Sequence, residues 1–235
     1  WRAAHPDHPL ARHLGAALAG EAGEARAADD YVRQVFDVFA ADFDERLAEL
    51  GYRAPEALAA ALTEAGVLAD GAGLAVLDAG CGTGLCAPLL RAAAQRLEGV
   101  DLSEGMLARA AARGLYDALH AAELTAFLQS RPGGFDLIVA ADVLCYFGDL
   151  TQALAAARAA LRPHGVFAFS VERWEAPESG RAYALQAHGR YAHDEAATLA
   201  GLAAAGFQLL ASESAALRLE SGQPVIGLVI VARAA

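Results

Sequence analysis

The chain has 235 residues, a formal net charge of −11 and a hydrophobic fraction of 56%. This length suits one α/β domain and excludes a second large one. The negative charge argues against a nucleic-acid partner, because affinity for a phosphate backbone comes mainly from cationic contacts. All 18 basic residues are arginine, which excludes enzymes that need a Walker-type phosphate lysine or a Schiff-base lysine.

Hydropathy and cysteine content predict a soluble cytoplasmic protein without a metal site. No apolar run approaches the ~18 residues of a membrane-spanning helix, so we expect no membrane association. Cys81, Cys86 and Cys145 are an odd number without the spacing of a disulfide framework. We identify no secretory leader, and we therefore expect reduced thiols and no bound metal.

The first 28 residues are predicted to form a short helix and a linker, apart from a domain that spans residues 29–235. An apolar pattern through Leu10, Leu14 and Leu18 indicates the helix, and a mixture of glycine, alanine and glutamate follows it. The linker composition places the domain boundary near residue 28.

Two further helices are predicted before the first strand. Apolar and aromatic residues recur at helical spacing from Asp29 to Leu50, which predicts one long amphipathic helix. Pro55 opens the next helix, which runs to Gly66, because proline suits a first turn where no N–H donor is needed.

A glycine-rich turn is the chemical centre of the sequence. The apolar run 74–77 predicts a strand buried on both faces, and it ends at Asp78 and three alternate glycines, Gly80, Gly82 and Gly84. Glycine tolerates positive φ and lets a ligand touch the backbone. The pattern predicts a nucleotide-type binding loop.

The residues after the glycines distinguish between nucleotides. The apolar run Leu85–Ala94 predicts a helix whose free amino-terminal N–H groups point at the ligand. A dinucleotide fingerprint anchored on Gly80 would require glycine in place of Leu85, which disfavours an oxidoreductase. Asp78 would repel a pyrophosphate but could hold an ammonium group.

A second acid follows one helix later. The segment Leu97–Ser103 predicts a strand that ends at Asp101, about 20 residues past the glycines, where a carboxylate grips ribose hydroxyls in βαβ units. Ser103 is a suitable N-cap for a helix from Glu104 to Arg113 that carries Met106.

Three segments resemble the class I S-adenosylmethionine-dependent methyltransferases. They are VLDAGCGTG (76–84), GVDLSEGML (99–107) and FDLIVAADVL (135–144), and the similarity runs from about Tyr31 to the C-terminus. The resemblance implies an α/β fold with a doubly wound, mostly parallel, seven-stranded Rossmann-like sheet and N-terminal helices. Its strand order would be 3-2-1-4-5-7-6, with the last strand antiparallel.

The resemblance also implies a cofactor, S-adenosylmethionine, with S-adenosylhomocysteine as product. A third strand over Leu115–Ala121 would bring Glu123 to the adenine amino group. Alternatively, Glu123 merely begins the helix to Gln129, where an acid favours the helix dipole. The implied cofactor-binding residues are Asp78, Gly80, Cys81, Gly82, Asp101, Leu102, Met106, Glu123, Leu124 and Ala140.

The acceptor is expected beyond the fourth strand, Phe135–Asp142, at the switch point of the sheet. The Asn-Pro-Pro-Tyr run of enzymes that methylate amide-like amines is absent there, which disfavours nucleic-acid and protein amides. Phe39, Phe43 and Tyr52 could form a lid. Candidate bases are Asp142 and His193, and candidate acceptor-pocket residues are Tyr146, His188 and Tyr191.

The remaining elements complete the expected sheet. A helix over Asp149–Leu161 leads to a fifth strand over Gly165–Glu172, and a long irregular segment, Arg173–Tyr191, follows it. Two strands, Phe207–Leu219 and Pro224–Ala232, form a closing hairpin.

Three functions compete at this point. The first is methyl transfer to a small-molecule acceptor by in-line displacement. The second is methylation of a protein chosen by an N-terminal repeat region, because some similar methyltransferases follow tetratricopeptide repeats and residues 7–21 resemble the end of such an array. The third is a module that binds S-adenosylmethionine without turnover.

Overall fold

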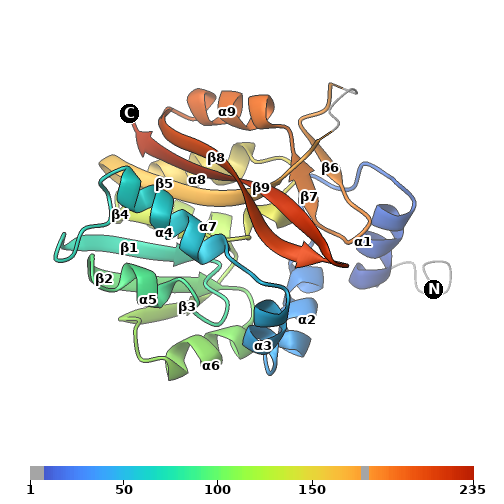
Figure 1. Cartoon of the computed structure of the whole chain (residues 1–235), viewed down its shortest axis with the longest axis horizontal. Coiled ribbons are helices and arrows are strands. Elements are labelled where there is room, and N and C mark those ends of the chain that lie inside the picture. Colours follow the sequence, from blue (N-terminus) through green and yellow to red (C-terminus); the bar gives the residue numbers. More distant parts are fainter. Residues whose placement is uncertain (1–7, 176–179) are drawn as a thin grey trace.

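One twisted sheet forms the centre of the computed structural model, which describes residues 8–175 and 180–235 (Figure 1). Its parallel half runs in the order β3-β2-β1-β4-β5. The strands are β1 (Leu74–Ala79), β2 (Ala94–Asp101), β3 (Ala118–Ala121), β4 (Phe135–Ala140), β5 (Leu161–Arg173), β6 (Tyr183–Leu185), β7 (Tyr191–His193), β8 (Phe207–Glu220) and β9 (Gln223–Ala234).

The closing hairpin completes the sheet as predicted. Strand β9 pairs antiparallel with β5 over Val166–Glu172, and β8 pairs antiparallel with β9. With β9 as the seventh strand and β8 as the sixth, the order 3-2-1-4-5-7-6 is confirmed. A short hairpin of β6 and β7 begins inside the segment predicted to be irregular and ends two residues beyond it, and β7 pairs with β5 at Glu172 and Arg173.

Helices cover both faces of the sheet, with α4 across the front and α8 behind (Figure 1). Successive residues of β1 show why both faces are covered, since Val76 packs in the cluster with Leu58 of α4 while Leu77 packs in the cluster with Leu154 of α8. The helices are α1 (Pro9–Leu18), α2 (Asp29–Phe39), α3 (Phe43–Glu49), α4 (Ala54–Glu64), α5 (Ala87–Leu90), α6 (Glu104–Ala112), α7 (Leu124–Gln129), α8 (Thr151–Ala160) and α9 (Glu195–Ala204), with a 3-10 turn, η1 (Leu144–Tyr146).

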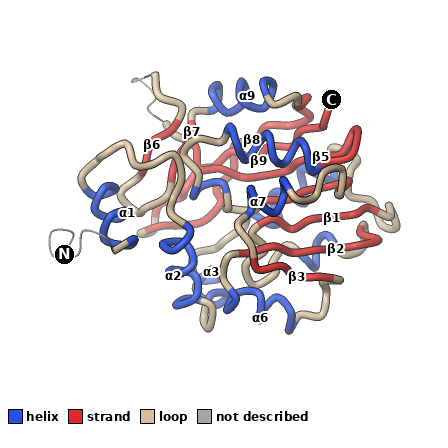
Figure 2. Tube along the Cα trace, turned by 180° about the vertical axis from the view of Figure 1, so that it is seen from behind, coloured by secondary structure: helices blue, strands red, loops and turns tan. Residues whose placement is uncertain are grey.

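The prediction of one long helix from Asp29 to Leu50 is wrong. The chain leaves the helical conformation at Asp42, where φ is −120°, and α2 and α3 become separate helices. The break is stabilised by Arg109 of α6, whose guanidinium donates to the carbonyls of Ala40 and Ala41. Both helices then lie beyond the carboxyl ends of β1, β2 and β3 (Figure 2).

The helix predicted over Leu85–Ala94 is also shorter than expected, because α5 covers only Ala87–Leu90. The helix ends early because Ala94, only four residues after Leu90, already pairs with Leu74 at the start of β1. The third strand is shorter as well, and Tyr116 lies before it rather than in it.

The amino-terminal helix α1 packs against the rest of the domain. Ala17 shares a small apolar cluster with Leu185 and Tyr191, and a ring nitrogen of His13 lies 2.7 Å from the carbonyl oxygen of Gly189. The boundary at residue 28 stays a prediction. None of the described helices has the length and apolarity to span a bilayer.

Candidate functional site

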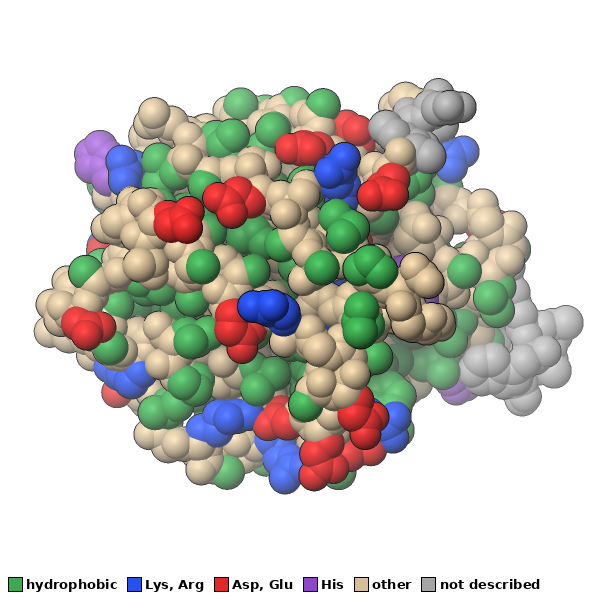
Figure 3. Space-filling view, viewed as in Figure 1, with side chains coloured by type: hydrophobic (Ala, Val, Ile, Leu, Met, Phe, Trp, Pro, Cys, Tyr) green, Lys and Arg blue, Asp and Glu red, His purple; other side chains and the backbone are tan. Residues whose placement is uncertain are grey.

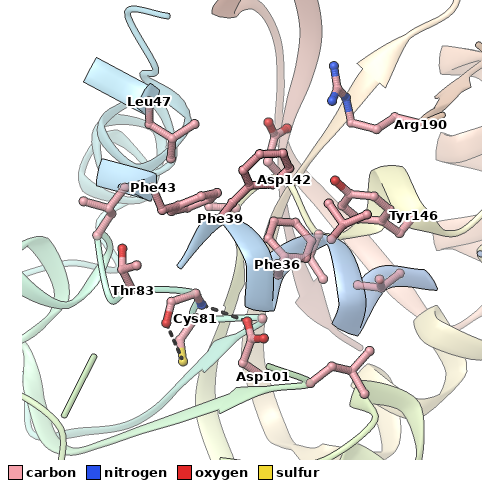
Figure 4. Close-up of a pocket in the computed structure, with 18 of the residues that line it drawn as sticks. Phe36, Phe39, Phe43, Leu47, Cys81, Thr83, Asp101, Asp142, Tyr146 and Arg190 are labelled. Carbon is pink, nitrogen blue, oxygen red and sulfur yellow. Dashed lines mark hydrogen bonds between the residues drawn. The ribbon is translucent and has the colours of Figure 1, made fainter. Parts of the chain in front are cut away.

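A cavity of about 410 Å³ lies between the carboxyl ends of the parallel strands and the helices α2 and α3 (Figure 4). Loops after β1, β2, β3 and β4 form its floor, and aromatic side chains of α2 and α3 form its opposite wall. Among the predicted cofactor residues, the lining includes Asp78, Gly80, Cys81, Gly82, Asp101, Leu102, Glu123 and Leu124.

The glycine loop can only be built from glycine at its first position. Gly80 has a φ of +67°, and a Cβ there would overlap Cγ2 of Val143, which follows β4. Gly82 has a φ of +53°. The loop therefore presents bare backbone to the cavity, as contact with a ligand requires.

Asp78 is buried at the end of β1 and accepts a hydrogen bond from the phenol of Tyr116 at 2.6 Å. Burial raises its pKa to about 7, the Tyr116 hydrogen bond opposes that rise, and the Asp101 charge adds to it. A cationic group in the cavity would restore the ionised form of this carboxylate.

Asp101 fixes the glycine loop from the next strand. Its Oδ2 accepts from the N–H of Gly82 at 2.9 Å, and its Oδ1 accepts from the N–H of Ser103 at 2.9 Å. Burial raises its pKa, while these backbone donors oppose the rise. A carboxylate has about four acceptor positions, so Asp101 can accept a further hydrogen bond, which suits a hydroxyl donor from a sugar.

Glu123 is the N-cap of α7, as the alternative interpretation predicted. Its carboxylate accepts from the N–H groups of Thr125 and Ala126, and it also pairs with Arg26 at 2.7 Å. Burial acts to raise its pKa, but these donors hold the pKa below its usual value. Glu123 still lines the cavity, together with Leu124.

Aromatic rings close the opposite wall. Phe36 packs edge-on against Phe43 and against Tyr146, with ring centroids 5.8 Å and 5.5 Å apart. Phe39 and Tyr52 also line the cavity. The three residues predicted to form a lid thus face the site, while their movement stays a prediction.

Asp142 lines the cavity just after β4, in a left-handed conformation with a φ of +57°. Its Oδ2 accepts from Arg218 of β8 at 2.5 Å. Arg218 also pairs with Glu172, which accepts from Nε of Arg190 at 2.7 Å. Arg190 and Arg218 both reach the cavity wall.

Five predicted site residues lie outside this lining. Met106 and Ala140 are fully buried in the core. His188 lies 3.3 Å from Glu172, and the Tyr191 hydroxyl donates to the carbonyl of Glu24 at 2.8 Å. These four therefore reach the cavity only through neighbouring residues.

His193, a candidate base, lies outside the cavity lining. It is buried, its Nε2 lies 2.8 Å from the carbonyl oxygen of Phe147, and burial lowers its pKa to about 4. These surroundings favour the neutral form of the imidazole.

The polar side chains of the site that the sequence analysis missed include Arg26, Tyr116, Arg190 and Arg218. Arg218 alternates with Leu217 and Leu219 in a strand, a pattern that predicts an arginine on the solvent face, yet its side chain is only 5% exposed. The other three come from loops, where no periodicity indicates a direction.

Comparisons with known proteins agree with this site. A family model described as a methyltransferase domain matches residues 35–212. Methyltransferase-like protein 27 of Homo sapiens is 42% identical over 106 residues, which is 44% of this chain and 43% of that protein. Ubiquinone biosynthesis O-methyltransferase of Aromatoleum aromaticum is 33% identical over 104 residues, 42% and 44% of the two chains. The chain thus matches less than half the length of these curated relatives.

Solved structures share the fold. The 1,6-didemethyltoxoflavin-N1-methyltransferase of Burkholderia thailandensis, with bound 1,6-didemethyltoxoflavin and S-adenosylhomocysteine, has a TM-score of 0.65 and 26% identity over 87% of this chain and 89% of that one. Magnesium protoporphyrin IX methyltransferase of Synechocystis PCC 6803 with bound SAM has a TM-score of 0.65 and 20% identity, over 90% and 100% of the two chains.

The family match extends over most of the chain, from α2 into β8, and includes the glycine loop, Asp101 and the segment after β4. The chain belongs to the methyltransferase-domain family.

Proposed function

We propose that this protein binds S-adenosylmethionine in the cavity and transfers its methyl group to a small-molecule acceptor. The observation that carries the proposal is the meeting of Asp78, the bare backbone of Gly80–Gly82 and Asp101 in one cavity. A buried acid, an uncovered loop and a second acid match the ammonium, linker and ribose of that nucleoside in chemistry and order.

The bound cofactor supplies an electrophilic methyl group on a sulfonium. Asp78 holds the cofactor's ammonium group, Asp101 accepts from its ribose hydroxyls, and Leu102 and Leu124 pack against its adenine. Cys81 contributes backbone, because its thiol is buried and burial raises its pKa, which keeps it protonated. The aromatic wall excludes water, so positioning supplies much of the rate.

The relatives and the surface charge favour a small-molecule acceptor. The B. thailandensis relative was solved with 1,6-didemethyltoxoflavin and S-adenosylhomocysteine, and the curated relatives include a ubiquinone biosynthesis O-methyltransferase. On the face in Figure 3, basic side chains lie scattered among acidic and apolar ones. With a net charge of −11, this supports an acceptor other than nucleic acid.

Calorimetry with S-adenosylhomocysteine and with NADH tests the cofactor. We expect micromolar binding of S-adenosylhomocysteine and none of NADH, and the reverse result would contradict the proposal. Transfer of an isotope-labelled methyl group across an acceptor panel then tests turnover. Cofactor binding without any transfer would favour the non-catalytic interpretation, and transfer only to a protein would favour the repeat-directed one, whose link to tetratricopeptide repeats stays a prediction.

A further inference from the structure

An ion-pair network lies on the side of the cavity opposite Asp101, where Figure 4 shows Asp142, Tyr146 and Arg190. Arg218 is its centre, since it pairs with both Asp142 and Glu172. Arg190 pairs with Glu172 and with Glu220, so every guanidinium in the network is already engaged by carboxylates.

One carboxylate oxygen in this network has no protein partner. Oδ1 of Asp142 is buried, and no hydrogen-bond donor reaches it from the part of the chain that the structure describes. The residue cannot readily turn away, because its N–H donates to Oγ of Ser170 at 2.9 Å and its carbonyl accepts from Sγ of Cys145 at 3.1 Å. A buried acceptor left unpaired is costly, and a donor on a ligand would relieve that cost.

The charge around this oxygen excludes an anionic ligand. Two arginines, Arg190 and Arg218, stand against three acids, Asp142, Glu172 and Glu220, so the network has an excess of one negative charge when His188 is neutral. The rest of the wall is aromatic, from Phe36, Phe43 and Tyr146.

We propose that the acceptor is an uncharged aromatic molecule whose hydroxyl or amino group donates a hydrogen bond to Oδ1 of Asp142, with Arg218 as the positioning residue for that carboxylate. This inference rests on the proposed function, because it assigns the acceptor of the same cavity. It adds the chemical class of the acceptor and the group that recognises it.

For a hydroxyl acceptor, the step balances in full. The acceptor O–H bond breaks as Oδ1 of Asp142 takes the proton, and an oxygen lone pair forms the new bond to the methyl carbon. The carbon–sulfur bond breaks with its electron pair on sulfur, which leaves S-adenosylhomocysteine. The proton then passes from Asp142 to solvent when product leaves.

The surroundings of Asp142 set when it is ionised. Burial raises its pKa, and the Arg218 charge opposes that rise. Loss of the Arg218 charge would therefore move the ionisation of Asp142 to higher pH. The charged and titratable groups that face Asp142 are Arg218, Glu172, Arg190, Tyr52, Cys145 and Tyr146.

The first experiment compares three matched probes on protein saturated with S-adenosylhomocysteine: 2-naphthol, 2-methoxynaphthalene and 2-naphthoate. We expect 2-naphthol to bind at least about tenfold more tightly than the other two, the value of a hydrogen bond to a charged group. Asp142→Asn should remove most of this preference, whereas Asp136→Asn, on β4 and outside the cavity lining, should leave it unchanged.

Each other outcome counts against the inference. Equal or tighter binding of 2-naphthoate, or an unchanged preference in Asp142→Asn, would overturn it, and failure of all three probes to bind would contradict an aromatic acceptor. Calorimetry with S-adenosylhomocysteine on the same samples separates this failure from failure of the proposed function, because the residues assigned to that ligand are Asp78 and Asp101 and we expect its affinity to be unchanged in Asp142→Asn.

The second experiment tests Arg218 through the pH dependence of 2-naphthol binding. The affinity for 2-naphthol should fall as Asp142 is protonated. Arg218→Met should move the pH midpoint of this fall to a higher value, and Arg218→Lys should return the midpoint most of the way to the wild-type value. Arg162→Met, which removes the 2.7 Å pair with Asp136, is the control and should leave the midpoint in place. Identical midpoints in wild type and Arg218→Met would contradict the positioning role.

Discussion

The hydroxyl of Tyr116 lies 2.6 Å from Oδ2 of Asp78 and so ties the segment before β3 to the end of β1. The same ring fills the space beside two glycines: a Cβ on Gly84 would lie 3.0 Å from its Cε2, and one on Gly99 would lie 3.1 Å from its Cε1. One side chain therefore sets both the glycine loop and the carboxylate assigned to the ammonium group.

Tyr116→Phe should weaken binding of S-adenosylhomocysteine by about tenfold at neutral pH, because one hydrogen bond to a charged group is lost. The hydrogen bond lowers the pKa of Asp78, so its loss raises that pKa and leaves more of the carboxyl protonated. Binding should recover as the pH rises. Calorimetry over a pH series checks this, and a loss that is the same at every pH would contradict it.

Asp101→Ala should weaken binding of S-adenosylhomocysteine more severely, by roughly a hundredfold. The two ribose hydroxyls would lose their charged hydrogen-bond acceptor, and the N–H of Gly82 would lose its acceptor as well. The matched control is Asp117→Ala, which removes an exposed aspartate that pairs with Arg91. Unchanged affinity in Asp101→Ala would contradict the assignment of Asp101 to the ribose hydroxyls.

The stability of the ligand-free protein should depend on Asp78. Its pKa is about 7 when folded, above its ordinary value of 3.8, so the folded state holds this proton more tightly than the unfolded state. Asp78 therefore does not lower the free energy of unfolding below about pH 4, and it lowers that free energy increasingly as the pH rises towards 7. Asp78→Asn should raise the melting temperature at pH 8 by an amount that corresponds to a few kcal/mol, and change it little at pH 4. Thermal unfolding at both values tests the sign.

Gly80→Ala should cost more stability than Gly71→Ala. Both glycines are left-handed, with φ of +67° and +72°, so both substitutions carry a conformational cost of about 1–2 kcal/mol. Only Gly80 also meets Val143, while nothing lies within 4 Å of a Cβ on Gly71. Adding Val143→Ala should recover the excess. Equal losses in denaturant unfolding of the two single variants would show that the loop can move aside.

The central strands and the cofactor loop could be predicted from the sequence. The strand that ends in Asp78, the glycine turn and Asp101 could be predicted because strand, turn and βα spacing are local features. Asp78, Gly80, Gly82 and Asp101 all line the cavity. The order of the sheet followed from the resemblance and is confirmed by the strand pairing.

Only the tertiary structure decided which distant side chains meet. Arg218 reaches Asp142 across 76 positions, Tyr116 reaches Asp78 across 38, and Arg26 reaches Glu123 across 97. It also places His193 outside the cavity lining, with its Nε2 2.8 Å from the carbonyl oxygen of Phe147. Local sequence patterns determine backbone conformation and burial, whereas the partner of a charged side chain depends on how separate elements pack, which no spacing along the chain encodes.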